Sequence, residues 1–220
     1  AEMSELLVLG WLVLQLTGSA WQVALVGLSR TATTFSFSLI AGALGDRLDR
    51  RQVVMASQAG SVVITIAVLG ILTLGIIEPW HLFIAAGLRG ACRSFDHTCR
   101  RALIFDVVGP KHVLQAVSLD HIGFSSGKIV GPLLIGILME ITGTAVSSYV
   151  VLTILHMLSL TGISLVSPNL ILSRYPRRRP VLTSITEGLV YAYTTPPIAG
   201  VLVTSVVMNV MFQYHLFIPV

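Results

Sequence analysis

The sequence predicts an all-α membrane protein that crosses the bilayer several times. Hydrophobic residues make up 54% of the 220 residues, and charged residues only 11%. Soluble domains carry about 25% charged residues, and a mean hydropathy of +0.85 is typical of a chain whose surface faces lipid. The apolar residues also form runs long enough to cross a hydrocarbon core about 30 Å thick.

Seven apolar segments follow one another, separated by turns or polar loops. They span residues 6–16, 21–43, 52–77, 80–99, 113–139, 145–166 and 198–220. A helical span needs about 20 apolar residues, and only the first segment is clearly shorter. Its flank carries Glu2 and Glu5 and no basic residue, which does not fit a signal peptide. We interpret it as a transmembrane helix cut off at its start.

The polar stretch 168–197 divides the chain into two parts. It separates a six-helix bundle, residues 1–167, from the first helix of a second bundle, residues 198–220. Within it, the capping-box sequence 184–187 and the helically spaced apolar residues of 182–193 predict a short amphipathic helix on the inner membrane surface. Because the sequence stops inside an apolar run, we interpret the chain as a fragment of a longer protein.

Basic residues occupy alternate connections between the apolar segments. The turns at 16–21, 77–80 and 141–148 contain no Lys or Arg, whereas the loop at 45–51 and the polar stretch after residue 167 are Arg-rich. By the positive-inside rule the Arg-bearing loops are cytoplasmic. The sequence thus predicts a multi-pass protein of the cell (inner) membrane, with membrane lipids as partners. The net charge of +4 reflects this topology, and nucleic acid is not an expected partner.

The loop after the second apolar segment contains the most specific local motif. It reads Gly-Ala-Leu-Gly-Asp-Arg-Leu-Asp-Arg-Arg over residues 42–51. Gly42 and Gly45 allow a helix end to pack closely and turn, and Asp46 can pair with Arg50 at i, i+4 spacing. A basic topology anchor with incidental acids explains the same residues as well.

This loop resembles motif A of the major facilitator superfamily, which lies between the second and third helices of those transporters. The resemblance implies a helical transporter built from two related bundles. It also implies a conformational latch between the bundles, formed here by Gly42, Asp46, Arg47, Arg50 and Arg51. Asp49 stands where the family has glycine. That departure is familiar in the drug- and siderophore-exporter branch, which includes enterobactin-exporter-like proteins.

The fifth apolar segment contains small residues at four-residue spacing. This spacing lets membrane helices approach closely, and the residues concerned are Gly123, Gly127, Gly131, Pro132 and Gly136. A helix-packing seam is therefore expected. The run 127–136 also resembles motif C, which marks the antiporter branches of the superfamily, although Ile135 replaces one of its terminal glycines. The resemblance implies export.

Charged residues on the fourth segment are candidates for a functional network. Ionisable side chains are costly at membrane depth and usually face a cavity or a partner. Asp96 can pair with Arg93 or with Arg100 along one helix face. From the family resemblance we hypothesise a network of Asp46, Arg50 and Asp96. The alternative is that the arginines are inner-leaflet anchors.

Two further charged residues lie inside predicted spans. Arg30 lies about 14 Å into the second segment, at 1.5 Å per residue. Asp120 lies near the cytoplasmic end of the fifth segment and is a candidate proton carrier, because a carboxylate can bind and release protons. An interfacial Asp120 paired with Lys111 or Lys128 is equally consistent with the sequence.

In the seventh segment, Asn209 and Gln213 share a helix face and are candidates for a substrate path. A helix–helix hydrogen bond is the alternative. Cys92, His97 and Cys99 form only a loose potential ligand set, and His97 lies around the helix from the other two, so no metal site is predicted. No cofactor motif, nucleotide-binding loop or catalytic signature is present in the sequence, and the chain is not expected to be an enzyme.

Together, these residues and the resemblance predict a secondary active transporter. The expected activity is proton-coupled efflux of small amphiphilic compounds, such as a drug or siderophore, by alternating access. One alternative is a truncated, non-transporting membrane fragment or scaffold. Another is an importer of the same superfamily.

Overall fold

The computed structural model describes residues 2–45 and 48–166, together with residues 200, 204 and 207. The chain forms two compact units, Ala1–Tyr175 and Pro176–Val220, and the account below concerns the first. The predictions for Asp46, Arg47, the amphipathic helix at 182–193, Asn209 and Gln213 lie outside the described residues.

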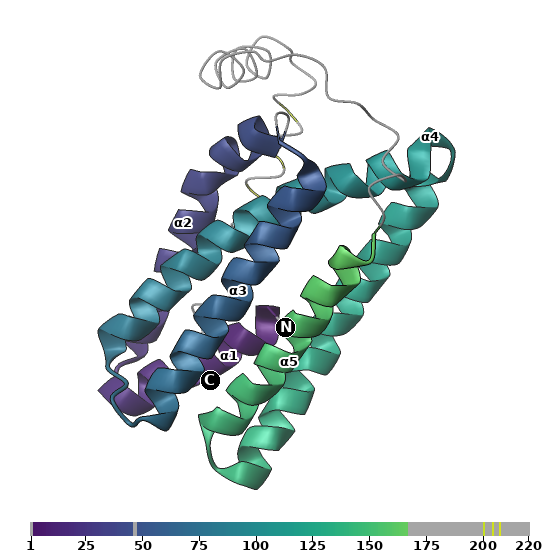
Figure 1. Ribbon diagram of the computed structural model, residues 1–220. Helices are drawn as coiled ribbons and strands as arrows, with labels where there is room; N and C mark the ends of the chain where they lie inside the picture. The colour runs from purple at the N-terminus through teal and green to yellow at the C-terminus, as the bar shows by residue number, and fades with distance from the viewer. Residues whose placement is uncertain (1, 46–47, 167–199, 201–203, 205–206, 208–220) are drawn as a thin grey trace. The chain divides into compact units, whose positions relative to one another are not determined.

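Every regular element in the described part of the first unit is an α-helix (Figure 1). The helices are α1 (Glu2–Thr17), α2 (Ala20–Gly45), α3 (Arg50–Thr73), α4 (Pro79–Thr142) and α5 (Ala145–Ser164). Helices α2 to α5 are long and apolar enough to cross a membrane. The predicted all-helical membrane class is therefore confirmed.

Helix α4 consists of two limbs that meet at Gly109. Its 64 residues would extend about 96 Å as one straight helix, far beyond a single span. Gly109 has φ 70° and ψ 174°, a conformation that favours glycine, and Pro110 suits the first turn of the helix that follows. Figure 1 shows the chain reversing near the α4 label, so that the second limb returns beside α5. The two limbs correspond to the fourth and fifth predicted segments.

The predicted end of the fourth segment, near residue 99, was too early. The chain continues as helix to the break at Gly109. Leu103 and Asp106 lie in this extension with 4% and 2% of their surface exposed. The extension 102–108 is mostly apolar, and its buried residues pack as part of α4 up to the glycine break.

Three short turns join successive helices at one end of the bundle. Each contains a glycine with positive φ: Gly18 after α1, Gly75 after α3 and Gly143 after α4. At Gly143 the backbone N–H donates to the carbonyl of Met139 at 2.8 Å and closes the last turn of α4, as left-handed C-caps do. These turns match the polar breaks predicted from the sequence.

The core lies where α1, α4 and α5 face one another, and its fully buried side chains include Val8, Leu9, Leu82, Ile135 and Leu152. Helices α2 and α4 approach closely at Gly90. A Cβ atom there would lie 2.4 Å from the backbone oxygen of Arg30. Thr34 Oγ1 donates to the Gly90 carbonyl at 3.1 Å across the same contact. This crossing fixes the position of Arg30 against α4.

We expect Gly90→Ala to destabilise the bundle, because the added methyl group collides with backbone that cannot rotate away. The free energy of unfolding in mixed detergent micelles should fall by about 1–3 kcal/mol. Gly87→Ala is the matched control, because its Cβ would meet only Ser29 and Thr33 hydroxyls at 3.7 Å. That change should shift stability by less than about 1 kcal/mol, and equal losses in both variants would contradict the close crossing.

Candidate functional site

A buried ion pair joins α1 to α4 in the interior of the bundle. Glu5 on α1 accepts hydrogen bonds from Nε and Nη2 of Arg89 on α4, with the Nε contact at 2.8 Å. The Arg89 and Glu5 side chains are only 5% and 3% exposed. A buried charge is costly unless it is paired and hydrogen-bonded, and here each ion supplies the counter-charge of the other.

His156 on α5 extends this pair to a third helix. Its Nε2 atom lies 2.8 Å from Nη2 of Arg89. A guanidinium has only donors, so Nε2 must accept this hydrogen bond and the ring is neutral, with its proton on Nδ1. Arg89 therefore binds a carboxylate and an imidazole at once.

These residues lie near the middle of their helices. Glu5, Arg30, Arg89 and His156 are ten to twelve residues from the helix ends at the Gly18, Gly75 and Gly143 turns. At 1.5 Å per residue this places them about 15–18 Å from that end, close to the midplane of a 30 Å hydrocarbon core. Ionisable residues at this depth mark functional sites in membrane proteins.

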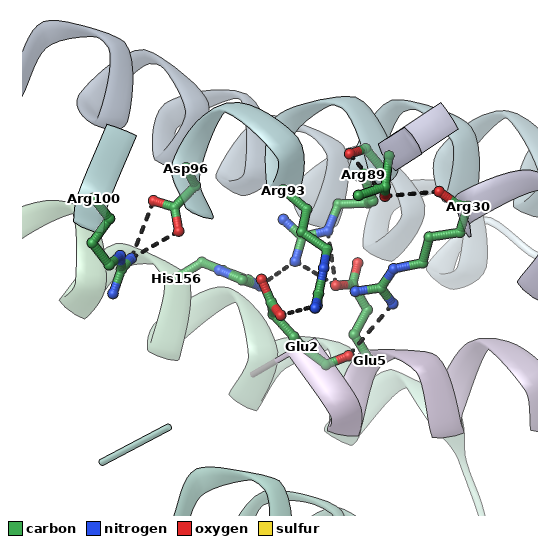
Figure 2. A network of polar contacts seen from close by, with 10 residues as sticks. Glu2, Glu5, Arg30, Arg89, Arg93, Asp96, Arg100 and His156 are labelled. Carbon is green, nitrogen blue, oxygen red and sulfur yellow. Dashed lines mark hydrogen bonds and ion pairs between the residues drawn. The ribbon is translucent and has the colours of Figure 1, made fainter. Parts of the chain in front are cut away.

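A second ion pair lies beside the first (Figure 2). Glu2 on α1 pairs with Arg93 on α4. The Glu2 backbone oxygen also accepts a hydrogen bond of 3.5 Å from Arg30 on α2. Figure 2 shows Glu2 and Glu5 directed from α1 toward the arginines of the neighbouring helices.

The third ion pair lies within α4. Asp96 pairs with Arg100 at 3.0 Å and accepts a hydrogen bond of 2.9 Å from the Gln58 side chain on α3. The predicted Asp96–Arg100 pairing is confirmed. Arg93, which could also have paired with Asp96, pairs with Glu2 instead. The alternative that the arginines are simply inner-leaflet anchors does not account for this contact between Arg93 and α1.

The ion pairs surround a cavity of about 480 Å³. Helices α1 to α5 all contribute to its wall, including Arg30, Gln58, Asp120, Lys128 and His156. Ligand sites of drug-sized molecules fall in this volume range. The cavity, together with its surrounding charges, is the candidate functional site.

The other predicted charged residues occupy the cavity wall in different ways. Asp120 has no ion-pair partner in the described part of the chain, so neither Lys111 nor Lys128 neutralises it there. Lys128 instead places its ammonium 4.5 Å from the Phe124 ring centroid, a cation–π contact. Whether Asp120 carries a proton stays a prediction.

Among the described residues, Arg50 forms its ion pair with Asp106 and not with Asp96. The hypothesised network also includes Asp46, which lies outside the described residues, and it stays a prediction. Arg50 at the start of α3 pairs with Asp106 at 2.8 Å, and the Asp106 side chain is 1% exposed. Asp106 lies beyond the predicted end of the fourth segment, near residue 99, in the extension of α4. About two further helical turns bring its carboxylate to Arg50, and the break at Gly109 comes three residues later.

Asp49, which departs from the family pattern, has a local structural role. Its side chain accepts a hydrogen bond of 2.9 Å from the Arg51 backbone N–H and caps α3. Arg51 Nη2 reaches the backbone oxygen of Ser164 at the end of α5, at 2.8 Å. The motif A-like loop thus contacts both α4 and α5 within this one unit.

The glycines of this loop differ in their surroundings. A Cβ on Gly45 would lie 2.9 Å from Cys99 Sγ on α4, whereas one on Gly42 would meet nothing within 4 Å. Close packing is therefore confirmed at Gly45. No disulfide joins Cys92 to Cys99, and Cys92 fills the corresponding space against Gly60 on α3.

Of the small residues in the predicted packing seam of the fifth segment, Gly131 packs closely against another helix in the described part of the chain. A Cβ on Gly131, next to Pro132, would lie 2.4 Å from Ser4 Oγ on α1. Nothing lies within 4 Å of such an atom on Gly123, Gly127 or Gly136, and Gly123 and Gly127 line the cavity. A packing role for these three stays a prediction.

Sequence reasoning missed Glu2, Glu5 and His156. The two acids were read only as the polar flank of a shortened span. One signal was available: Arg30, Arg89 and Arg93 lie in apolar spans and need counter-charges there, and the acids at positions 2 and 5 lie one helical turn apart. For His156 the sequence held no comparable signal.

Apolar helices arranged around a charged cavity at their midplane are the architecture of a multi-pass membrane transporter. Comparison with known protein families agrees with the class of membrane transporters and identifies the family. The chain belongs to the transmembrane secretion effectors, a family of the major facilitator superfamily, which it matches over residues 4–214. Members of this superfamily are transporters and not enzymes, and the predicted drug- and siderophore-exporter relationship is confirmed.

Three curated relatives are similar to this chain. The multidrug efflux pump Tap of Mycolicibacterium fortuitum is 27% identical over 219 residues, covering 92% of this chain and 51% of that protein. The uncharacterized MFS-type transporter YfiS of Bacillus subtilis is 24% identical, covering 90% and 48%. The staphyloferrin A transporter of Staphylococcus aureus is 26% identical over 135 residues, covering 60% and 34%. The chain therefore spans about half the length of the first two relatives.

We expect Arg50 and Asp106 to be energetically coupled. In a double-mutant cycle with Arg50→Gln and Asp106→Asn, the coupling free energy of unfolding should be about 1 kcal/mol or more, because either single change leaves a charge without its partner. The control cycle pairs Arg50→Gln with Asp96→Asn. A larger coupling free energy in the control cycle than in the test cycle would contradict the Arg50–Asp106 pairing and favour the hypothesised network of Asp46, Arg50 and Asp96.

Proposed function

We propose that this chain forms one half of a secondary active transporter that exports small amphiphilic compounds by proton-coupled alternating access. The family membership supports transport, and Tap supports efflux by analogy with that protein. The observation that carries the proton coupling is the buried Glu5–Arg89–His156 cluster. It is a carboxylate site at membrane depth, next to a polar cavity.

The cluster suggests how one proton could change the state of the transporter. Ionised Glu5 holds Arg89 through two hydrogen bonds to one oxygen. Protonation of Glu5 would remove its negative charge and weaken its contact with Arg89. The Arg89 guanidinium would then lack a counter-charge at this position. Since α1 and α4 are joined at this point, the change alters the contact between two helices of the cavity wall. If the substrate binds one protonation state of the protein more tightly than the other, substrate binding and proton binding are energetically coupled.

The loop contacts suggest where the conformational change is restrained. Arg50 with Asp106, and Arg51 with the Ser164 carbonyl, tie the start of α3 to α4 and to the end of α5. We infer that this Arg-rich loop is cytoplasmic, following its positive charge, and that the protein lies in the cell (inner) membrane. Gly42, Asp46, Arg47, Arg50 and Arg51 are proposed to act as the latch between the two bundles.

We expect Glu5→Gln to reduce proton-driven export strongly. Glutamine preserves the size and hydrogen-bonding capacity of the side chain, but it cannot bind and release a proton. In inverted membrane vesicles that contain the protein expressed from its whole reading frame, the rate of fluorescent-dye uptake driven by a pH gradient should fall about tenfold or more, the scale of one charge-assisted hydrogen bond.

Glu140→Gln provides the control, because Glu140 is exposed near the end of α4 and away from the cavity. It should retain wild-type uptake. In intact cells, a protonophore should raise dye accumulation with the wild type and have no effect with Glu5→Gln. Export that survives in Glu5→Gln with an unchanged response to the protonophore would refute the proposed role of Glu5, and dye import would refute the direction.

A further inference from the structure

The charges around the cavity are unequal. Six cationic side chains line it: Arg30, Arg89, Arg93, Arg100, Arg101 and Lys128. Only three carboxylates do so, on Glu2, Asp96 and Asp120. Even when Glu5 is added as the partner of Arg89, cations outnumber carboxylates by two. The neutral histidine found beside Arg89 does not alter this balance.

The carboxylates nearest the buried arginines are already engaged. Glu2 binds Arg93, Glu5 binds Arg89 and Asp96 binds Arg100. Within the described chain, Arg30, Arg101 and Lys128 have no carboxylate partner. Asp120 has no ion-pair partner there either, so these three cations and one carboxylate account for the excess of two positive charges.

Arg30 is the most informative of the three, because it is only 7% exposed and lies about 15 Å from the end of α2. The Arg30 guanidinium donates a hydrogen bond of 3.5 Å to the Glu2 backbone oxygen. A guanidinium has five N–H donors. The carboxylates of Glu5 and Glu2 attract Arg30, but they form their ion pairs with Arg89 and Arg93. A buried cation at this depth is costly without a counter-charge of its own, and the Arg30 side chain faces a cavity that can admit one.

From these observations we propose that the cavity binds an organic anion, whose carboxylate-type oxygens are held by Arg30. Lys128 and, farther along α4, Arg101 add positive charge to the cavity wall. Guanidinium groups match carboxylates in a planar, two-hydrogen-bond geometry. The Phe124 ring in the wall offers an apolar surface to the rest of the molecule. The inference rests on the proposed transport function and specifies its substrate class as anionic amphiphiles rather than cationic ones.

Binding of dyes that share one xanthene ring system tests this charge preference. The purified whole-reading-frame protein in phosphatidylcholine nanodiscs is titrated with carboxyfluorescein, an anion, and with a cationic rhodamine ester, and binding is followed by fluorescence anisotropy. We expect carboxyfluorescein to bind at least about tenfold more tightly than the rhodamine ester. Tighter binding of the rhodamine ester would overturn the inference without any variant having to fold.

Variants then test the assigned residue. Arg30→Gln should weaken carboxyfluorescein binding about tenfold or more, and Arg30→Lys, which keeps the charge, should weaken it less. Lys111→Gln removes one exposed positive charge outside the cavity and should leave the affinity unchanged. Equal losses in Arg30→Gln and Lys111→Gln would overturn the assignment, since they would show a non-specific effect of net charge.

A lipid headgroup could present similar anionic oxygens, so the titration is repeated in phosphatidylglycerol nanodiscs. Retained carboxyfluorescein affinity supports a soluble organic anion, whereas its loss would assign the cavity to lipid and overturn the inference. Transport is measured separately. Anion binding without proton-driven transport would refute the proposed function alone, and proton-driven efflux of the cation without anion binding would refute this inference alone.

Discussion

The Glu5–Arg89 ion pair is the interaction on which the rest of the bundle interior depends. In lipid the hydrophobic effect does not drive helices together, so packing and polar contacts between helices determine how they associate. This pair joins α1 to α4, and the contact between Arg89 and His156 adds α5. Without either ion, the other would be left uncompensated at membrane depth. The pair therefore fixes which faces of three helices turn inward.

Close contacts between the backbones of neighbouring helices also position the residues around that pair. Gly90 permits α2 to lie against α4 so closely that a methyl group would not fit, and Arg30 is carried into the cavity wall by this crossing. At the far end of the first limb of α4, the break at Gly109 turns the chain back after Asp106 has reached Arg50. Small residues and charged residues thus act together: the first allow the approach, and the second select the register.

Ion pairing in the described part of the chain is selective. Arg89, Arg93 and Arg100 each have a carboxylate partner, and Arg50 has Asp106. Arg30 lacks one within the described chain while being buried. The contrast gives the cavity a distinct chemistry, because structural pairs consume the available carboxylates and leave a cation facing the open volume.

The sequence by itself determined the membrane class, the family and, within the described residues, the order of the spans and the turns between them. It could do so because apolar run length, glycine turns and the loop at 42–51 are local signals. It did not determine where the fourth span ends. It also located Arg30, Arg93 and Asp96 as charges within spans. Only the tertiary structure decided which of them meet. Glu2 rather than Asp96 pairs with Arg93, and Asp106 rather than Asp96 pairs with Arg50. The physical reason is that partners 56 to 91 residues apart are selected by helix crossing and rotation, and a one-dimensional pattern of charges does not specify either.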